Sequence, residues 1–220
     1  MFGLDDHIAA LSNSGSILVV LLVATLLGLR HATDPDHVAA VSTLVASGGE
    51  RARRRAAELG AWWGLGHALT LVVFGIPILL FEAYLPDLVQ RGAETAVAAL
   101  IVFLAVRLLV RHRHRHEHGH QVRNPLAAFG IGLVHGMVGS AGVGVLLLAA
   151  IPSTALAVTS LVVLAFFTAV SMTMVTTGFG ATLASRQGAL AAAAPVFGIA
   201  SLAFGCWYAA AAWSLMPYPF

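Results

Sequence analysis

The sequence Arg30-His31-Ala32-Thr33-Asp34-Pro35-Asp36-His37 interrupts a segment that is otherwise apolar from residue 17 to residue 46. Ionisable groups at membrane depth are costly, at about 2.5–3.5 kcal/mol for each charged group on insertion scales. Such a cluster persists where its members satisfy one another, face water or bind an ion. Imidazole and carboxylate groups together are typical ligands of a divalent transition metal. The stretch therefore predicts a metal site inside a membrane-spanning segment.

The composition of the whole chain indicates an integral membrane protein. Of the 220 residues, 59% are hydrophobic and 10% are charged, whereas a soluble domain has about 25% charged residues. Few residues lie outside the apolar segments, so we expect no nucleic-acid partner. The one cysteine, Cys206, cannot form an internal disulfide. Residues 1–13 lack the cationic start of a cleavable signal peptide, so we expect the first span to act as an uncleaved insertion signal.

Six apolar segments provide the roughly 20 residues that a transmembrane helix needs. They are residues 16–46, 59–85, 93–110, 125–150, 154–184 and 190–214. The first is too long for one straight span, because its 31 residues would reach about 45 Å across a hydrocarbon layer of about 30 Å. Asp is a good N-cap and Pro is favoured at the first helical position. We therefore expect a broken first helix whose second half starts at Pro35, as is tolerated where a helix lines a site.

The arginines set the expected orientation. They concentrate in residues 51–55, in residues 111–123 and at Arg186, which lie in three connections between spans. With six spans these connections share one side of the membrane, and the positive-inside rule makes that side cytoplasmic. We expect a multi-pass protein of the cytoplasmic (inner) membrane with both termini extracytoplasmic.

The two halves of the chain resemble each other. Gly28-Leu29-Arg30-His31 matches Gly132-Leu133-Val134-His135 at an offset of 104 residues, and the same offset places His67 opposite Ser171. We expect an all-α fold of two inverted three-helix repeats, residues 1–110 and 125–220, joined by a His- and Arg-rich cytoplasmic loop at 111–124. A site at the interface of such repeats is a common plan of transporters.

The candidate ligands converge only if the first helix is broken. On a continuous helix, His31 differs in direction from Asp36 by about 140° and from His37 by about 120°, whereas Asp34 shares a face with His31. His67, in the second span, and His135, in the fourth, are further candidates. The alternatives are a buried His–Asp network that only locks helices, a His67 that bonds a backbone carbonyl, and glycines around His135 that serve packing alone.

Two other polar regions carry open interpretations. Ser171, Thr173, Thr176 and Thr177 either line the ion path or bond back to carbonyls of their own helix. The segment His112–His120 is rich in His and Arg, and tracts of this kind commonly bind metals. We expect it to be a cytoplasmic metal buffer or sensor rather than the transport site, the alternative being an ordinary charged loop.

Three motifs resemble those of the nickel/cobalt transporter family. His31-x4-Asp36-His37 resembles the family signature, and Leu65-Gly66-His67 resembles its second motif. The stretch from Leu133 to Ala141 is similar to the small six-helix branch of urease-accessory membrane permeases. The resemblance implies that His31, Asp36 and His37 select the metal, with Asp34 nearby. The chain lacks the acidic Phe-Asp-Thr-Ala-Thr-Glu motif of the longer, eight-span members.

We therefore expect a permease, not an enzyme, that takes up Ni²⁺ or Co²⁺ through a His/Asp site near the membrane midplane. The ion is the substrate and no cofactor is expected; the other partner is the lipid bilayer, and a homo-oligomer is left open. Uptake should fall at acidic pH, because neutral imidazole binds metal and protonated imidazole does not. Three alternatives stand: an exporter of the same ions, an intramembrane metalloenzyme, although no His-Glu-x-x-His pattern occurs, and a metal-binding accessory subunit that does not transport.

Overall fold

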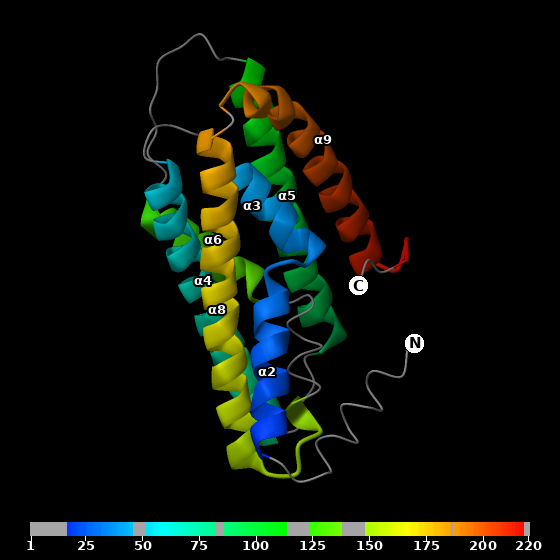
Figure 1. Cartoon of the computed structure of the whole chain (residues 1–220). Helices are drawn as coiled ribbons and strands as arrows, with labels where there is room; N and C mark the ends of the chain where they lie inside the picture. The colour runs from blue at the N-terminus through cyan, green and yellow to red at the C-terminus, as the bar shows by residue number, and fades with distance from the viewer. Residues whose placement is uncertain are drawn as a thin grey trace.

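The computed structural model describes residues 17–45, 52–81, 86–113, 124–137, 148–185 and 187–217. These residues form helices and turns and contain no strand, so the prediction of an all-α fold is confirmed. The long helices run side by side in an elongated bundle (Figure 1). The helices are α2 (Ile17–His31), α3 (Pro35–Val45), α4 (Ala52–Phe81), α5 (Asp87–Arg113), α6 (Pro125–His135), α8 (Thr154–Ser185) and α9 (Gln187–Ala212).

The first span is broken where the sequence predicts it. Helix α2 ends at His31, α3 begins at Pro35, and the two are bent by 46°. Backbone bonds close the turn between them, from Thr33 N to the Arg30 carbonyl at 2.9 Å and from Asp34 N to the His31 carbonyl at 3.2 Å. The break therefore leaves these amides paired, which is what allows a non-helical turn inside a membrane segment.

Four described helices are long and apolar enough to cross a bilayer, and the bent pair α2–α3 makes a fifth candidate span. The protein is accordingly a multi-pass membrane protein. Large apolar side chains on its outer faces agree with contact to lipid: Leu18, Phe166 and Val196 are each at least 60% exposed. In water, an apolar surface of this extent would drive association.

Two helices differ from the spans expected from hydropathy. Helix α4 begins at Ala52 rather than at residue 59, so that Arg53, Arg54 and Arg55 lie on its exposed first turns instead of in a loop. The fourth span was expected to run from 125 to 150, but α6 ends at His135 in a cap at Gly136. Residues 138–147 lie outside the described residues. The described α6 is thus a half-length helix, like α2.

Glycines set how closely the central helices approach. Helix α4 packs along α8 and α6, and α2 packs along α8. A Cβ atom added at Gly132 of α6 would lie 2.1 Å from the Trp63 carbonyl oxygen of α4. One added at Gly28 of α2 would lie 2.6 Å from the Leu164 carbonyl oxygen of α8. Only glycine permits backbones to come this near, as at other small-residue crossings in membranes.

The remaining helices close the bundle on one side. Helix α5 packs along α9, and α3 contacts α9, α5 and α8. The end of α5, the end of α8 and the starts of α4 and α9 lie together at the top of Figure 1, whereas α2 starts at the bottom. The first half of the broken span therefore reaches into the bundle from the end opposite the arginine-bearing first turns of α4.

Candidate metal centre

Four helices bring five buried ionisable side chains together. They come from the end of α2, the first turn of α3, the middle of α4 and the end of α6, and they are His31, Asp36, His37, His67 and His135. Each is at most 7% exposed. The structure thus brings these residues together, and the break after His31 is what turns the α2 and α3 side chains toward one another; their role as metal ligands stays a prediction.

Three imidazoles form the first group: His31, His37 and His67. One potential ligand atom from each lies within 4.8 Å of the others. The Nε2 atoms of His31 and His67 are 2.9 Å apart, and the His37 ring centroid lies 4.5 Å from that of His31. Two ligands on a metal with bonds of about 2.1 Å are separated by about 3.0 Å in octahedral and about 3.4 Å in tetrahedral geometry. Small side-chain rotations would therefore place all three nitrogens on one ion.

The second group contains the buried carboxylate of Asp36 with His37 and His135. Its potential ligand atoms also lie within 4.8 Å of one another. Asp36 Oδ1 is 3.0 Å from His37 Nδ1, and Asp36 Oδ2 is 3.3 Å from His135 Nε2. The second pair is close but lacks the alignment of a hydrogen bond, so both atoms have no hydrogen-bond partner. Buried polar atoms without partners are uncommon, and here both belong to residues of one group of potential metal ligands.

Asp34 lies beside the cluster rather than among its core members. Its Oδ2 atom is 3.5 Å from His31 Nδ1, and its Oδ1 atom is 3.9 Å from the guanidinium of Arg30. The Arg30 side chain is 75% exposed, while that of Asp34 is 10% exposed. A carboxylate on Nδ1 holds an imidazole so that Nε2 faces inward, as do the outer partners of metal-bound histidines. Asp34 on His31 and Asp36 on His37 share this arrangement.

Helix ends add to the field at the cluster. His31 lies in the last turn of α2 and His135 in the last turn of α6, so two helix C-termini point at the same place. The C-terminus of a helix carries partial negative charge, which favours a bound cation. Asp36, in the first turn of α3, is favoured by the positive end of its own helix.

Trp63 is part of the site's wall, and the sequence reasoning missed it. It is fully buried, with its ring centroid 5.7 Å from that of His37 and 5.8 Å from that of His135. Its indole Nε1 has no hydrogen-bond partner. The available signal was spacing, since Trp63 precedes His67 by four residues and so shares its helix face.

The threonine hydroxyl groups of α8 bond to carbonyls of their own helix, which was one of the two interpretations of this polar patch. Thr173, Thr176 and Thr177 each donate to the carbonyl four residues earlier, at 2.6–2.8 Å. Ser171 lies within hydrogen-bond distance of two carbonyls, that of Gly28 on α2 at 3.0 Å and that of Thr168 on its own helix at 3.2 Å. The side chains of the His- and Arg-rich segment 112–120 lie outside the described part of the chain, so its metal-buffer role stays a prediction.

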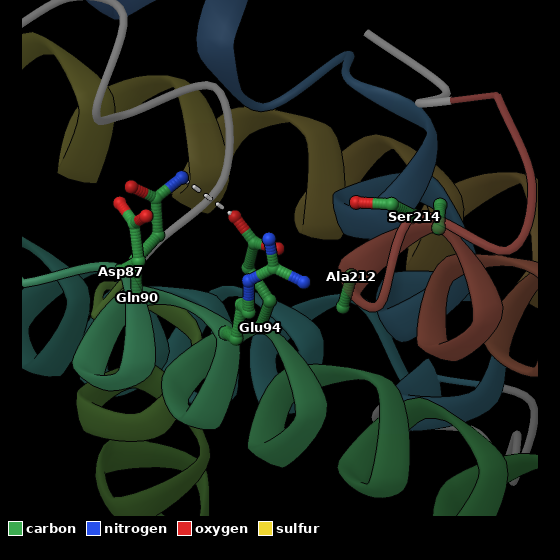
Figure 2. Close-up of a pocket in the computed structure, with 7 residues that line it drawn as sticks. Asp87, Gln90, Glu94, Ala212 and Ser214 are labelled. Carbon is green, nitrogen blue, oxygen red and sulfur yellow. Dashed lines mark hydrogen bonds between the residues drawn. The ribbon is translucent and has the colours of Figure 1, made fainter.

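A separate pocket of 210 Å³ lies between the start of α5 and the end of α9 (Figure 2). Its lining includes Asp87, Arg91 and Glu94, and Gln90 Nε2 donates to Glu94 Oε1 at 2.9 Å. Glu94 is 3% exposed. None of the histidines of the cluster lines this pocket. Glu94 is therefore a buried carboxylate that lies outside the candidate metal centre.

Comparisons with known proteins place the cluster in context. A family model described as high-affinity nickel-transport protein matches residues 17–128, which include His31, Asp36, His37 and His67 but end before His135. The chain is 29% identical over 139 residues to the urease accessory protein UreH of Bacillus sp. (strain TB-90). That match covers 57% of this chain and 60% of the relative, so the chain spans less than two thirds of the relative's length. No solved structure matches the chain.

Proposed function

We propose, because the chain belongs to the high-affinity nickel-transport protein family, that it is a permease which takes up Ni²⁺ or Co²⁺ across the cytoplasmic membrane. The observation that carries the proposal is the convergence of four buried imidazoles and a buried carboxylate from four helices of an otherwise apolar bundle. Five such groups buried together are costly in a membrane unless they satisfy one another, face water or bind an ion, and several of their polar atoms have no hydrogen-bond partner. A high-affinity site suits the collection of a scarce ion, which favours uptake over export.

The donor set favours a late first-row transition metal. Imidazole suits nickel, copper, zinc and iron, whereas Mg²⁺ and Ca²⁺ prefer oxygen ligands alone. Four of the five buried groups are imidazoles. The family description names nickel, and Co²⁺ neighbours it in size and in the order of affinities.

We assign the roles as follows. His31, His37 and His67 supply nitrogen ligands, and His135 supplies a further one next to Asp36. Asp34 and Asp36 hold the rings of His31 and His37 by their Nδ1 atoms, and Asp36 adds a negative charge near the ion. Arg30 beside Asp34 offsets the charge of that carboxylate when no ion is bound.

The fold we propose is the pair of inverted three-helix repeats, residues 1–110 and 125–220. Packing of the described helices supports it: α6 lies on α4 as α2 lies on α8. An added Cβ at Gly132 meets Trp63, and one at Gly28 meets Phe167. Both glycines and both aromatic residues are separated by the same 104 positions. In this plan the arginine-bearing end of the bundle is cytoplasmic and both termini are extracytoplasmic.

Flux through the purified protein tests the proposal. The full chain is reconstituted alone into liposomes, and Ni²⁺ entry is measured with Co²⁺ and Zn²⁺ as competitors. We expect entry that Co²⁺ inhibits and that His37→Gln lowers at least tenfold, because His37 belongs to both groups of ligands. Equal entry into liposomes with and without the protein would contradict a permease and favour an accessory subunit.

Direction is tested in cells. Expression of the wild-type chain should raise the nickel content of cells at low external nickel, relative to cells that express His37→Gln. A fall in nickel content would contradict uptake and assign export instead.

A further inference from the structure

We infer that the cluster holds a single ion in either of two overlapping positions, and that His37 carries the ion between them. This inference rests on the proposed function. The first position is formed by His31, His37 and His67, and the second by Asp36, His37 and His135. The two groups share only His37 and do not merge into one set of donors within 4.8 Å of each other.

His37 is placed to serve both positions. Its Nδ1 atom faces Asp36, at 3.0 Å, whereas its Nε2 atom is buried with no hydrogen-bond partner. Its ring centroid lies 4.5 Å from His31 and 4.7 Å from His135, and it meets those rings at 64° and 72°. The two nitrogens of an imidazole point in different directions, so Nε2 can offer a ligand to the first position and Nδ1 to the second in turn.

The outer members of the two positions are farther apart. The His67 and His135 ring centroids are separated by 6.4 Å, whereas the His37 centroid lies 5.1 Å from that of His67 and 4.7 Å from that of His135. The close pairs fall within one position each: His31 with His67 at 2.9 Å, and Asp36 with His135 at 3.3 Å. A single ion that bound all five groups would have to pull these pairs together, whereas an ion that moves between them needs only small rotations.

Charge limits the cluster to one ion and separates the two positions. The first position consists of three imidazoles that are neutral when they bind metal, whereas the second contains the carboxylate of Asp36. Two divalent ions that share one imidazole would repel strongly in a buried site. One position is therefore vacated as the other fills.

The positions also follow the two halves of the chain. His31 ends α2 and His135 ends α6, and each belongs to only one position. These histidines occupy equivalent places in the repeated Gly-Leu-x-His sequence. Transfer on His37 therefore passes the ion from the end of one half-helix to the end of its counterpart, at the interface of the two proposed repeats, where transporters of this plan bind their substrates.

The test uses Co²⁺ as a spectroscopic probe of the full-length protein in detergent. His67→Gln removes a ligand of the first position only, His135→Gln removes one of the second only, and His37→Gln removes one of both. We expect one Co²⁺ per wild-type chain by equilibrium dialysis. His67→Gln and His135→Gln should each still bind one Co²⁺, with different visible spectra whose weighted sum reproduces the wild-type spectrum. His37→Gln should bind at least a hundredfold more weakly.

Flux completes the test. In liposomes, His67→Gln and His135→Gln should both transport at least tenfold more slowly than the wild type although both bind Co²⁺. Ser160→Ala, which removes a buried hydroxyl outside the cluster, is the matched control and should transport normally. His67→Asn and His135→Asn take the place of the Gln variants if those fail to fold.

Three results would overturn the inference. Normal transport by His135→Gln, with binding lost in both His67→Gln and His37→Gln, would mean one position and leave the permease proposal intact. Two Co²⁺ bound per wild-type chain would contradict single occupancy. No binding of Co²⁺ or Ni²⁺ to the wild type would remove the permease proposal and the relay together.

Discussion

Replacing Gly132 by Ala should abolish most Ni²⁺ transport, although the methyl group that it adds lies outside the metal centre. The added Cβ would lie 2.1 Å from the Trp63 carbonyl oxygen and 2.9 Å from the His67 backbone nitrogen. Ordinary contact begins near 3.4 Å, so α6 must recede from α4 by about 1.3 Å. The neighbours are backbone atoms of a helix and cannot rotate away, unlike the end of a flexible side chain.

The shift would act on the site directly. His67 lies on the helix that is pushed, and His135 follows Gly132 by three residues on the other. A functional constellation tolerates displacements of about 0.5 Å, so a shift of about 1.3 Å exceeds the tolerance. We expect Ni²⁺ uptake below a tenth of the wild-type value, together with a loss of stability of about 1–3 kcal/mol from overpacking.

Gly130→Ala is the matched control, because it adds the same methyl group to the same helix where nothing lies within 4 Å. The assay is initial Ni²⁺ uptake into liposomes at equal protein content, with thermal unfolding of each purified variant in detergent. Equal uptake and equal unfolding temperatures for Gly132→Ala and Gly130→Ala would refute the claim that the α4–α6 contact positions the cluster.

Three further predictions concern the cluster and its surroundings. Asp36→Asn should weaken Ni²⁺ binding about ten- to hundredfold, as loss of an outer partner of a metal ligand does. Calorimetric titration checks this, with Glu94→Gln as a buried carboxylate control. Equal Ni²⁺ affinities of Asp36→Asn and the wild type would count against the role of Asp36. Uptake should be lower at pH 5 than at pH 7.5, because protons compete for imidazole nitrogens; a flat profile across that range would argue against histidine ligands. Ser171→Ala should leave Ni²⁺ uptake within twofold of the wild-type value and lower the free energy of unfolding by about 0.6 kcal/mol, since the Ser171 hydroxyl bonds the Gly28 carbonyl. Collapse of uptake at unchanged stability would instead place Ser171 on the ion path.

The break in the first span could be predicted from local sequence. Asp34-Pro35 favours a new helix start, and the length of the apolar segment requires a division. These effects act within a few residues, so no knowledge of the rest of the fold was needed. The structure confirms the predicted helix start at Pro35, and it shows that α2 ends at His31.

The convergence of His67 and His135 on that break depends on contacts far apart in sequence. Gly-rich motifs indicate close packing but do not say against what, and only the structure pairs Gly132 with Trp63. Hydropathy could not predict that α6 ends at His135 either, because the residues that follow are as apolar as the helix itself. Trp63 was overlooked because an apolar residue in an apolar helix carries no signal until its neighbours are known.

X-ray absorption at the nickel edge of the purified, Ni²⁺-loaded protein tests the central claim most directly, since it counts the ligands of the bound ion. Both positions contain at least two imidazoles, so we predict two to three imidazole nitrogens in the first shell with their outer-ring scattering. His37→Gln removes one imidazole from both positions, so that scattering should be weaker in this variant. An ion surrounded by oxygen alone in the wild type, or an unchanged spectrum in His37→Gln, would contradict a buried histidine site.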